Sequence, residues 1–133
     1  TGVQTCALPI WVEPVLLERL RERFHDVEFG TVRKRDDPPR ECVLVAVPGQ
    51  KATPVSQQAR LRVSVWVRRD DGTGDIDAAQ NLAADIELYL TGLYPPRPVV
   101  TIDHESGPIR MSDENGCLMA YLTLLLTVET NQA

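Results

Sequence analysis

The chain has 133 residues, of which 43% are hydrophobic and 25% are charged, a composition typical of one compact domain. This composition excludes a disordered, collagen-like or membrane-spanning chain. With 14 Lys and Arg against 19 Asp and Glu, the formal net charge is -5, so a nucleic-acid role would need a local basic patch.

The N-terminal segment, residues 1–10, matches the translation of a common sequencing-adapter read. We therefore exclude it from the fold expectations, and we expect the native protein to begin at or before Trp11 and residues 11–133 to form a single domain. Cys42 and Cys117 are then the remaining cysteines. Because the sequence has no CxxC pair and no nearby pair of histidines, we interpret both as buried free thiols.

The first part of the chain predicts a helix, an extended segment and a loop. Between Glu13 and Phe24 the apolar residues recur at helical spacing and charged residues occupy the other face, which predicts an amphipathic helix. An extended segment is expected over residues 27–32. Residues 33–39 are expected to form a solvated loop, since the two prolines at its end prevent regular strand pairing.

The middle of the chain predicts two strands joined by a loop. Residues 42–47 are a continuous apolar run, typical of a strand covered on both faces. Residues 50–58 have mixed polarity and no period, which predicts a loop. The next stretch alternates strictly, with valines on a predicted core face and with these residues on the other face: Arg60, Arg62, Ser64, Trp66 and Arg68.

The second half predicts a helix followed by two strands. Asp75 is expected to cap a helix that runs to about Leu90. The apolar stripe of this helix contains two alanines that allow close packing against a sheet, and it comprises Ile76, Ala79, Leu82, Ala83, Ile86 and Leu90. After an extended, proline-rich connection over residues 94–98, we expect a strand over 99–105 in which Val100 and Ile102 face the same way.

The end of the chain predicts two turns and a long strand. Turn residues cluster at 106–108 and again at 113–116, and strict alternation predicts a strand over 118–129. The expected order is therefore helix, three strands, helix, two strands. Strands grouped in runs indicate an α+β fold, with a single antiparallel or mixed sheet and both helices packed on it.

No motif in the sequence indicates catalysis or metal binding. His25 and His104 are the only histidines, and neither has the spacing of a metal ligand pair. Asp103 and Glu105 flank His104, but neighbours on a strand point to opposite faces, so we interpret them as an exposed strand end. The acidic pairs beside prolines or glycines are interpreted as turn residues: Asp36, Asp37, Asp70 and Asp71. We expect no enzymatic activity, no cofactor and no metal.

The most informative local feature is a group of three arginines around a tryptophan on one strand face: Arg60, Arg62, Trp66 and Arg68. Arginine and tryptophan dominate protein interfaces, so we interpret this group as a surface for a protein partner. Two alternatives stay open. Basic residues around an aromatic ring also suit single-stranded nucleic acid, and a helix lying over this face would bury the tryptophan.

Charge is distributed unevenly along the chain. Residues 31–69 contain nine basic and three acidic residues, whereas residues 70–133 contain two basic and eleven acidic residues. If the two segments occupy different flanks of the fold, the positive flank of one copy fits the negative flank of the next. Such a head-to-tail contact closes into a ring when its rotation permits.

Three stretches carry a resemblance to a known family. They are the loop and strand from Pro38 to Val45, the strand from Leu61 to Trp66 with an alanine-rich helix after it, and Ser106 to Pro108 with Tyr121 in the last strand. The alanines of that helix are Ala78, Ala79, Ala83 and Ala84. In these stretches and in the order of its elements, the chain resembles the tail terminator proteins of long-tailed, siphovirus-like bacteriophages. The resemblance covers nearly all of residues 13–130.

The resemblance implies a non-catalytic component of the virion. Such a protein caps the tail tube as a ring of about six copies, ends tube polymerisation and joins the tail to the head-completion proteins. The implied partners are further copies of the chain, the tail-tube protein and a head-completion or connector protein. DNA is implied only as passing through the ring lumen, and no membrane is implied.

The implied location is the head-proximal end of the tail in the virion, and the host cytoplasm during assembly. A head–tail connector or another minor tail-assembly protein has a similar size and setting and is an alternative. A single-stranded nucleic-acid binding module is the alternative of another class.

Overall fold

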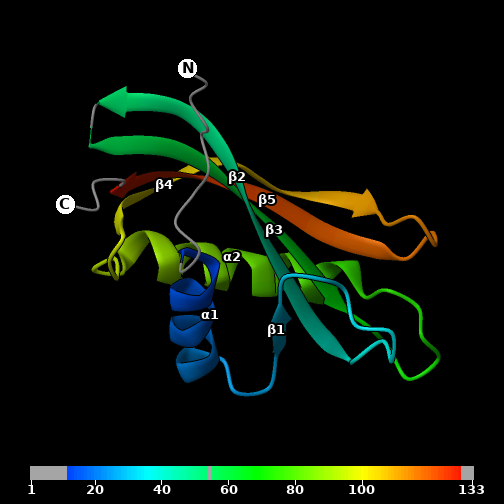
Figure 1. Ribbon diagram of the computed structural model, residues 1–133. Helices are drawn as coiled ribbons and strands as arrows, with labels where there is room; N and C mark the ends of the chain where they lie inside the picture. Colours follow the sequence, from blue (N-terminus) through cyan, green and yellow to red (C-terminus); the bar gives the residue numbers. More distant parts are fainter. Residues whose placement is uncertain (1–11, 54, 130–133) are drawn as a thin grey trace.

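The computed structural model describes residues 12–53 and 55–129 (Figure 1). The expectations about residues 1–10 and a native start near Trp11 lie outside this range. In chain order the elements are α1 (Val12–Arg23), β1 (Glu28–Gly30), β2 (Arg40–Thr53), β3 (Ser56–Val67), α2 (Ile76–Gly92), β4 (Val99–Ser112) and β5 (Leu118–Glu129). The predicted α+β class and the predicted order of elements are both confirmed.

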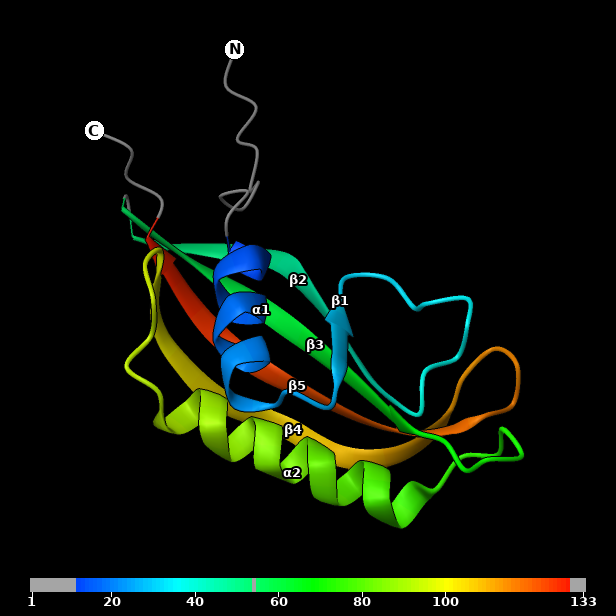
Figure 2. The same cartoon turned by 90° about the horizontal axis from the view of Figure 1, so that it is seen from below.

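The strands form one mixed sheet in the order β1-β2-β3-β5-β4. β1 is parallel to β2, and the other neighbouring pairs are antiparallel. Both helices lie on the same side of this sheet: Figure 1 shows them beneath it, and Figure 2 shows them in front of it when the molecule is seen from below. The sheet therefore has one face covered by helices and one face turned away from them.

The main core fills the space between the sheet and the two helices. Leu16 and Leu20 of α1, and Ala83 and Ile86 of α2, are fully buried there. The N-cap expectation for α2 is confirmed, because the side chain of Asp75 accepts a hydrogen bond from the Ala78 N–H. The strands contribute their inward-facing residues: Cys42, Leu44, Ala59, Leu61, Val63, Val65, Ala120, Leu122, Leu124, Leu126 and Val128.

The loop expected over residues 50–58 is wrong, because β2 and β3 continue through most of this stretch as a hairpin. The register of β2 shifts between Pro48 and Lys51 and again before Thr53. Each shift is a bulge, and a bulge removes the period of two on which the sequence prediction depended.

The free edge of β2 beyond β1 explains how a proline fits in this strand. β1 pairs only with the stretch of β2 from Glu41 to Val43. Farther along the same edge, the Ala46 N–H donates to Glu13 Oε2 of α1 at 2.8 Å. Pro48 is two residues later and has no N–H, so it leaves no unsatisfied donor on this edge.

The turn expected at residues 106–108 is also wrong, since these residues lie inside β4. The register of β4 shifts on both sides of Ser106, and Gly107 has a positive φ of 85°. A Cβ at this position would lie 2.5 Å from the Tyr121 carbonyl oxygen of β5, so the close approach of the two strands requires glycine. Turn-forming residues here produce a bulged strand.

A further register shift, at the start of β4, corrects the expected facing of its residues. Val100 and Ile102 do not face the same way: Ile102 is buried with Val99, whereas Val100 is exposed. The shift lies between Val99 and Thr101 and reverses the alternation expected from the sequence. In contrast, the turn predicted at 113–116 and the last strand predicted at 118–129 are confirmed.

Candidate interaction surface

The sheet face turned away from the helices is the candidate site. It has two parts, which differ in what covers them. We call the first part the covered end: Glu41, Val43, Trp66, Arg68 and Met119, all buried. We call the second part the open face, and it consists of the exposed or half-buried Val45, Val47, Arg60, Arg62 and Leu125, with the buried Thr123 between them.

Trp66 is buried in the covered end, which corrects the expectation that it lies on an exposed interface. Only 5% of the residue is exposed, and it packs against Val43 and Met119. Its Nε1 donates a hydrogen bond to Asp113 Oδ2 at 3.0 Å. Neither helix covers this ring, contrary to the open alternative of a covering helix; the turn containing Asp113 and Cys117 contacts it.

Arg68 is buried as well, so it does not belong to an exposed arginine patch. Its guanidinium donates to Glu41 Oε1 at 3.0 Å and to the Pro38 carbonyl at 2.7 Å. The other oxygen of Glu41 accepts from the Lys34 N–H at 2.6 Å. Arg68 also lies 5.6 Å from the centre of the Trp66 ring. The ion pair therefore fixes the loop of residues 31–39 to the covered end.

Asp113 connects the two segments that close the covered end. Its Oδ2 accepts from Trp66 and from Arg33 Nη1, the latter at 2.8 Å, and its Oδ1 accepts from the N–H groups of Asn115 and Cys117. Burial acts to raise the pKa of Asp113. The hydrogen bonds from Cys117, Trp66 and Asn115 and the charge of Arg33 outweigh burial and hold this pKa below its usual value.

Replacing Asp113 by Asn is expected to lower the free energy of unfolding by about 1 kcal/mol at neutral pH, because neutral acceptors bind these donors more weakly. A lowered folded-state pKa means that the stabilisation is present above the unfolded-state pKa of Asp113 and is lost as the pH falls through the folded-state value. The difference in the free energy of unfolding between wild type and D113N should thus shrink below about pH 4. Urea unfolding between pH 2 and pH 7 measures it.

Glu114 supplies the matched control for this prediction, since it is an exposed carboxylate in the same turn. The E114Q variant removes one charge without removing those hydrogen bonds, and its unfolding curve should follow that of the wild type. If the difference in the free energy of unfolding between wild type and D113N stayed constant down to pH 2, the charge of the Asp113 carboxylate would not be the source of the stabilisation.

The open face is built from two rows of residues that run across β2, β3 and β5. In the first row Val45, Arg62 and Thr123 are neighbours, and in the second row Val47, Arg60 and Leu125 are neighbours. Val45 is 36% exposed, which corrects the expectation that residues 42–47 form a strand covered on both faces. The open face therefore combines apolar side chains with arginines.

The two arginines of the open face differ in how they are bound. Arg60 makes a double hydrogen bond to Glu105 of β4, at 2.6 Å from Nε and 2.9 Å from Nη2. These bonds, together with Thr123, hold the pKa of Glu105 below its usual value. Arg62 is exposed, and no residue in the described part of the chain accepts a hydrogen bond or ion pair from its guanidinium. Arg62 is thus the cation available to a partner.

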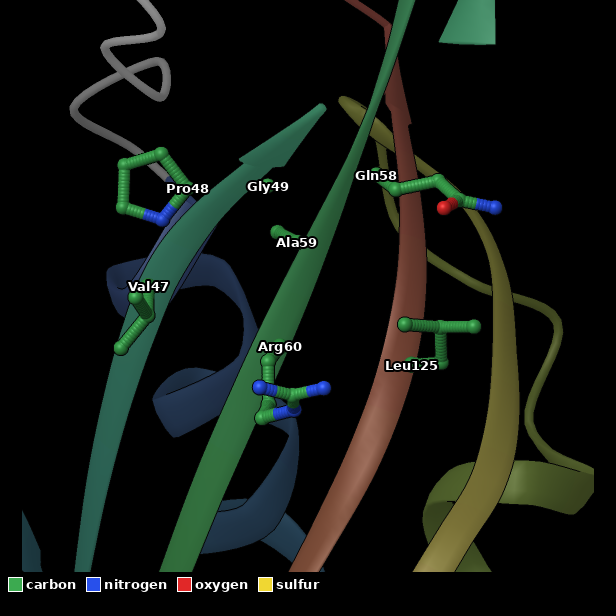
Figure 3. Close-up of a pocket in the computed structure, with 7 residues that line it drawn as sticks. All are labelled: Val47, Pro48, Gly49, Gln58, Ala59, Arg60 and Leu125. Atoms are coloured by element: carbon green, nitrogen blue, oxygen red, sulfur yellow. The ribbon is translucent and has the colours of Figure 1, made fainter. Parts of the chain in front are cut away.

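A hollow of about 200 Å³ opens on this face where β2 leaves its regular register (Figure 3). Figure 3 shows it between Val47 and Pro48 of β2, Arg60 of β3 and Leu125 of β5, and α1 lies behind the sheet. Its lining is partly apolar and partly cationic. Such a hollow suits an apolar side chain accompanied by an acidic one.

The remaining sequence candidates do not assemble into a site. His104 is exposed, as expected, but it lies inside β4 and not at a strand end, and its Nε2 donates to the Gly107 carbonyl oxygen at 2.7 Å. Asp71 accepts from Thr73 within its turn, as expected for a turn residue. Cys42 and Cys117 are both free thiols, as predicted. Cys42 is fully buried, which raises the pKa of its thiol, whereas Cys117 is only half-buried, which corrects the prediction that both are buried.

Within residues 12–53 and 55–129, no helix is long and apolar enough to cross a membrane. In the same ranges, no group of three or more His, Cys, Asp or Glu residues is arranged to hold a metal ion.

Comparison of the sequence with protein families and curated proteins identifies no relative. The chain matches no protein-family model and no curated protein. The arrangement of the sheet face described above therefore carries the functional argument.

The sequence pattern located only part of this surface. Arg60 and Arg62 lie on the open face as expected, whereas Val45, Val47 and Leu125 were not among the candidate residues. The strict alternation of β3 and β5 did indicate Leu125, since it shares a face with Tyr121 and Thr123 in that pattern. Val45 and Val47 were hidden in a continuous apolar run that carries no period.

Proposed function

We propose that this chain is a structural protein of a long-tailed bacteriophage that caps the tail tube as a ring. In this role it ends tube polymerisation and joins the tail to the head-completion proteins. The observation that carries the proposal is the open face: an apolar and cationic sheet surface that neither helix covers. Exposed apolar side chains with a free arginine are typical of a protein-binding surface.

The fold fits the mechanical demands of a cap. A cap must bind further copies through its sides and the last tube ring through one end, and it must offer no equivalent end to further tube subunits. One sheet with both helices on the same side gives the molecule two unlike faces. The element order and the stretches that resemble tail terminators support the same role.

The nucleic-acid alternative is less well supported. It required an aromatic ring on which bases stack, but Trp66 is buried and hydrogen-bonded to Asp113. Of the expected arginines, Arg68 is paired with Glu41 and Arg60 with Glu105. The cationic surface left for a phosphate backbone is therefore small. The open face gives no reason to prefer a head–tail connector over a tube cap.

Native mass spectrometry and negative-stain electron microscopy of the purified chain, over a series of increasing concentrations, test the proposal. A closed ring of about six copies is the expected result. Added to polymerising tail-tube protein, the ring should bind tube ends and stop elongation. Tubes that elongate at an unchanged rate, with no ring at their ends, would contradict the proposed function.

A further inference from the structure

The outer side of α2 carries an acidic stripe with one large apolar residue in it. The residues that point away from the core at helical spacing are Asp77, Asn81, Asp85, Leu88 and Gly92, all exposed. Leu88 is 66% exposed, and it lies one turn from Asp85. Figure 2 shows this side of α2 uncovered in front of the sheet.

The open face has the complementary character. It presents the free guanidinium of Arg62 beside Val45. The hollow between Pro48 and Leu125 lies two residues away along β3, at Arg60. The two strands that carry Val45 and the arginines, β2 and β3, belong to the basic segment 31–69, whereas α2 belongs to the acidic segment 70–133, as do β4 and β5. Opposite charges arranged in this way set both the partner and its orientation.

The spacing of the two surfaces also agrees. Asp85 and Leu88 are separated by about 4.5 Å along the helix axis, and Arg60 and Arg62 by about 7 Å along the strand. A long arginine side chain spans this difference. Leu88 can therefore lie in the hollow beside Arg60 while Asp85 reaches Arg62.

We infer that the occupant of the open face is α2 of a second copy of this chain, with Leu88 in the hollow and Asp85 paired with Arg62. The two surfaces lie on opposite sides of the molecule, α2 beneath the sheet and the open face above it (Figure 1). The contact is therefore heterologous: an open assembly has one free surface of each kind, at its two ends, until a ring closes. The inference rests on the proposed ring and specifies the contact that builds it.

Cross-linking between two variants, each with one accessible cysteine besides the buried Cys42, tests this contact directly. Cys6 and Cys117 are replaced by Ser in both, and Cys42 is kept because it is fully buried. R62C and L88C molecules are then mixed and treated with a short bis-maleimide. Cross-linked dimers are expected in the mixture and not in either variant alone. Dimers of R62C with itself would overturn the inference by showing a face-to-face contact.

Exchanging the two charges of the proposed ion pair provides a second test of the contact. R62D and D85R are each expected to weaken assembly at least tenfold, and the R62D/D85R double variant is expected to restore it. E22K is the matched control, because Glu22 is an exposed acid on α1 and its replacement also changes the charge by two. Assembly is measured by native mass spectrometry over the same concentration series, and E22K should assemble like the wild type.

The outcomes separate this contact from the function. If wild-type rings form but D85R rings form equally well and the mixture gives no cross-link, the contact is overturned while the proposed cap stands. If the wild type stays monomeric at every concentration and gives no cross-link, the contact is again overturned. The function is then judged by capping of tube ends alone.

Discussion

The W66A variant is expected to lose about 3–5 kcal/mol of the free energy of unfolding, the range for removing a large buried aromatic side chain. Trp66 is 5% exposed and packs in a small cluster with Val43 and Met119. Truncation leaves a cavity there and deprives Asp113 of a hydrogen-bond donor. Urea unfolding followed by circular dichroism measures the loss, since the signal does not depend on the tryptophan itself.

Two further variants locate the origin of this effect. W66F keeps most of the apolar contact but loses the Nε1 hydrogen bond, so its loss should be clearly smaller than that of W66A. R62A removes an exposed side chain from the same face of the same strand and should change the stability by less than about 0.5 kcal/mol. A W66A monomer as stable as the wild type, but unable to assemble, would show that Trp66 belongs to an interface after all.

The R68M variant is the second change with a large expected effect. It leaves the carboxylate of Glu41, which is 1% exposed, without its cation, and breaking one side of a buried ion pair costs about 3–5 kcal/mol. The Pro38 carbonyl also loses its donor. We expect the loop of residues 31–39 to detach from the covered end, which faster hydrogen exchange of its amides would report.

A double-mutant cycle with E41L gives the control for this prediction. Removing both charges leaves no buried ion, so R68M/E41L should be more stable than R68M alone. R97M serves as the comparison with an exposed pair, since Arg97 and Glu129 are 3.4 Å apart and the Arg97 side chain is 87% exposed. It should change stability by less than about 1 kcal/mol. If R68M and R97M lowered the free energy of unfolding equally, burial of the Arg68–Glu41 pair would not be the reason for the large effect of R68M.

The sequence predicted the elements whose signals are local. Asp75 and the apolar stripe after it defined α2, and unbroken alternation defined β5 and most of β3, because burial on one face imposes a fixed period. The hairpin between β2 and β3 and the continuation of β4 through Gly107 were missed. Both contain register shifts, and bulges mix the two faces so that no period remains.

The candidate surface was harder to predict, because burial on an outer sheet face depends on distant segments. Trp66 and Arg62 lie on the same side of β3, and nothing in that strand distinguishes them. Trp66 is buried by Asp113, which is 47 residues later in the chain, and Arg68 is held by Pro38, which is 30 residues earlier. Only the packing of these loops divides the strand into a covered end and an open face.

The hydrogen bond from Ala46 to Glu13, together with Pro48 beside it, has a consequence for solubility. A strand edge with free N–H groups is a template on which other chains add, and this addition leads to amyloid-like aggregation. Here one donor is already occupied by a carboxylate and the next is absent. At the opposite border, the bulges and Pro108 distort β4. Neither border therefore presents a regular row of free donors, which disfavours the addition of further strands at either edge.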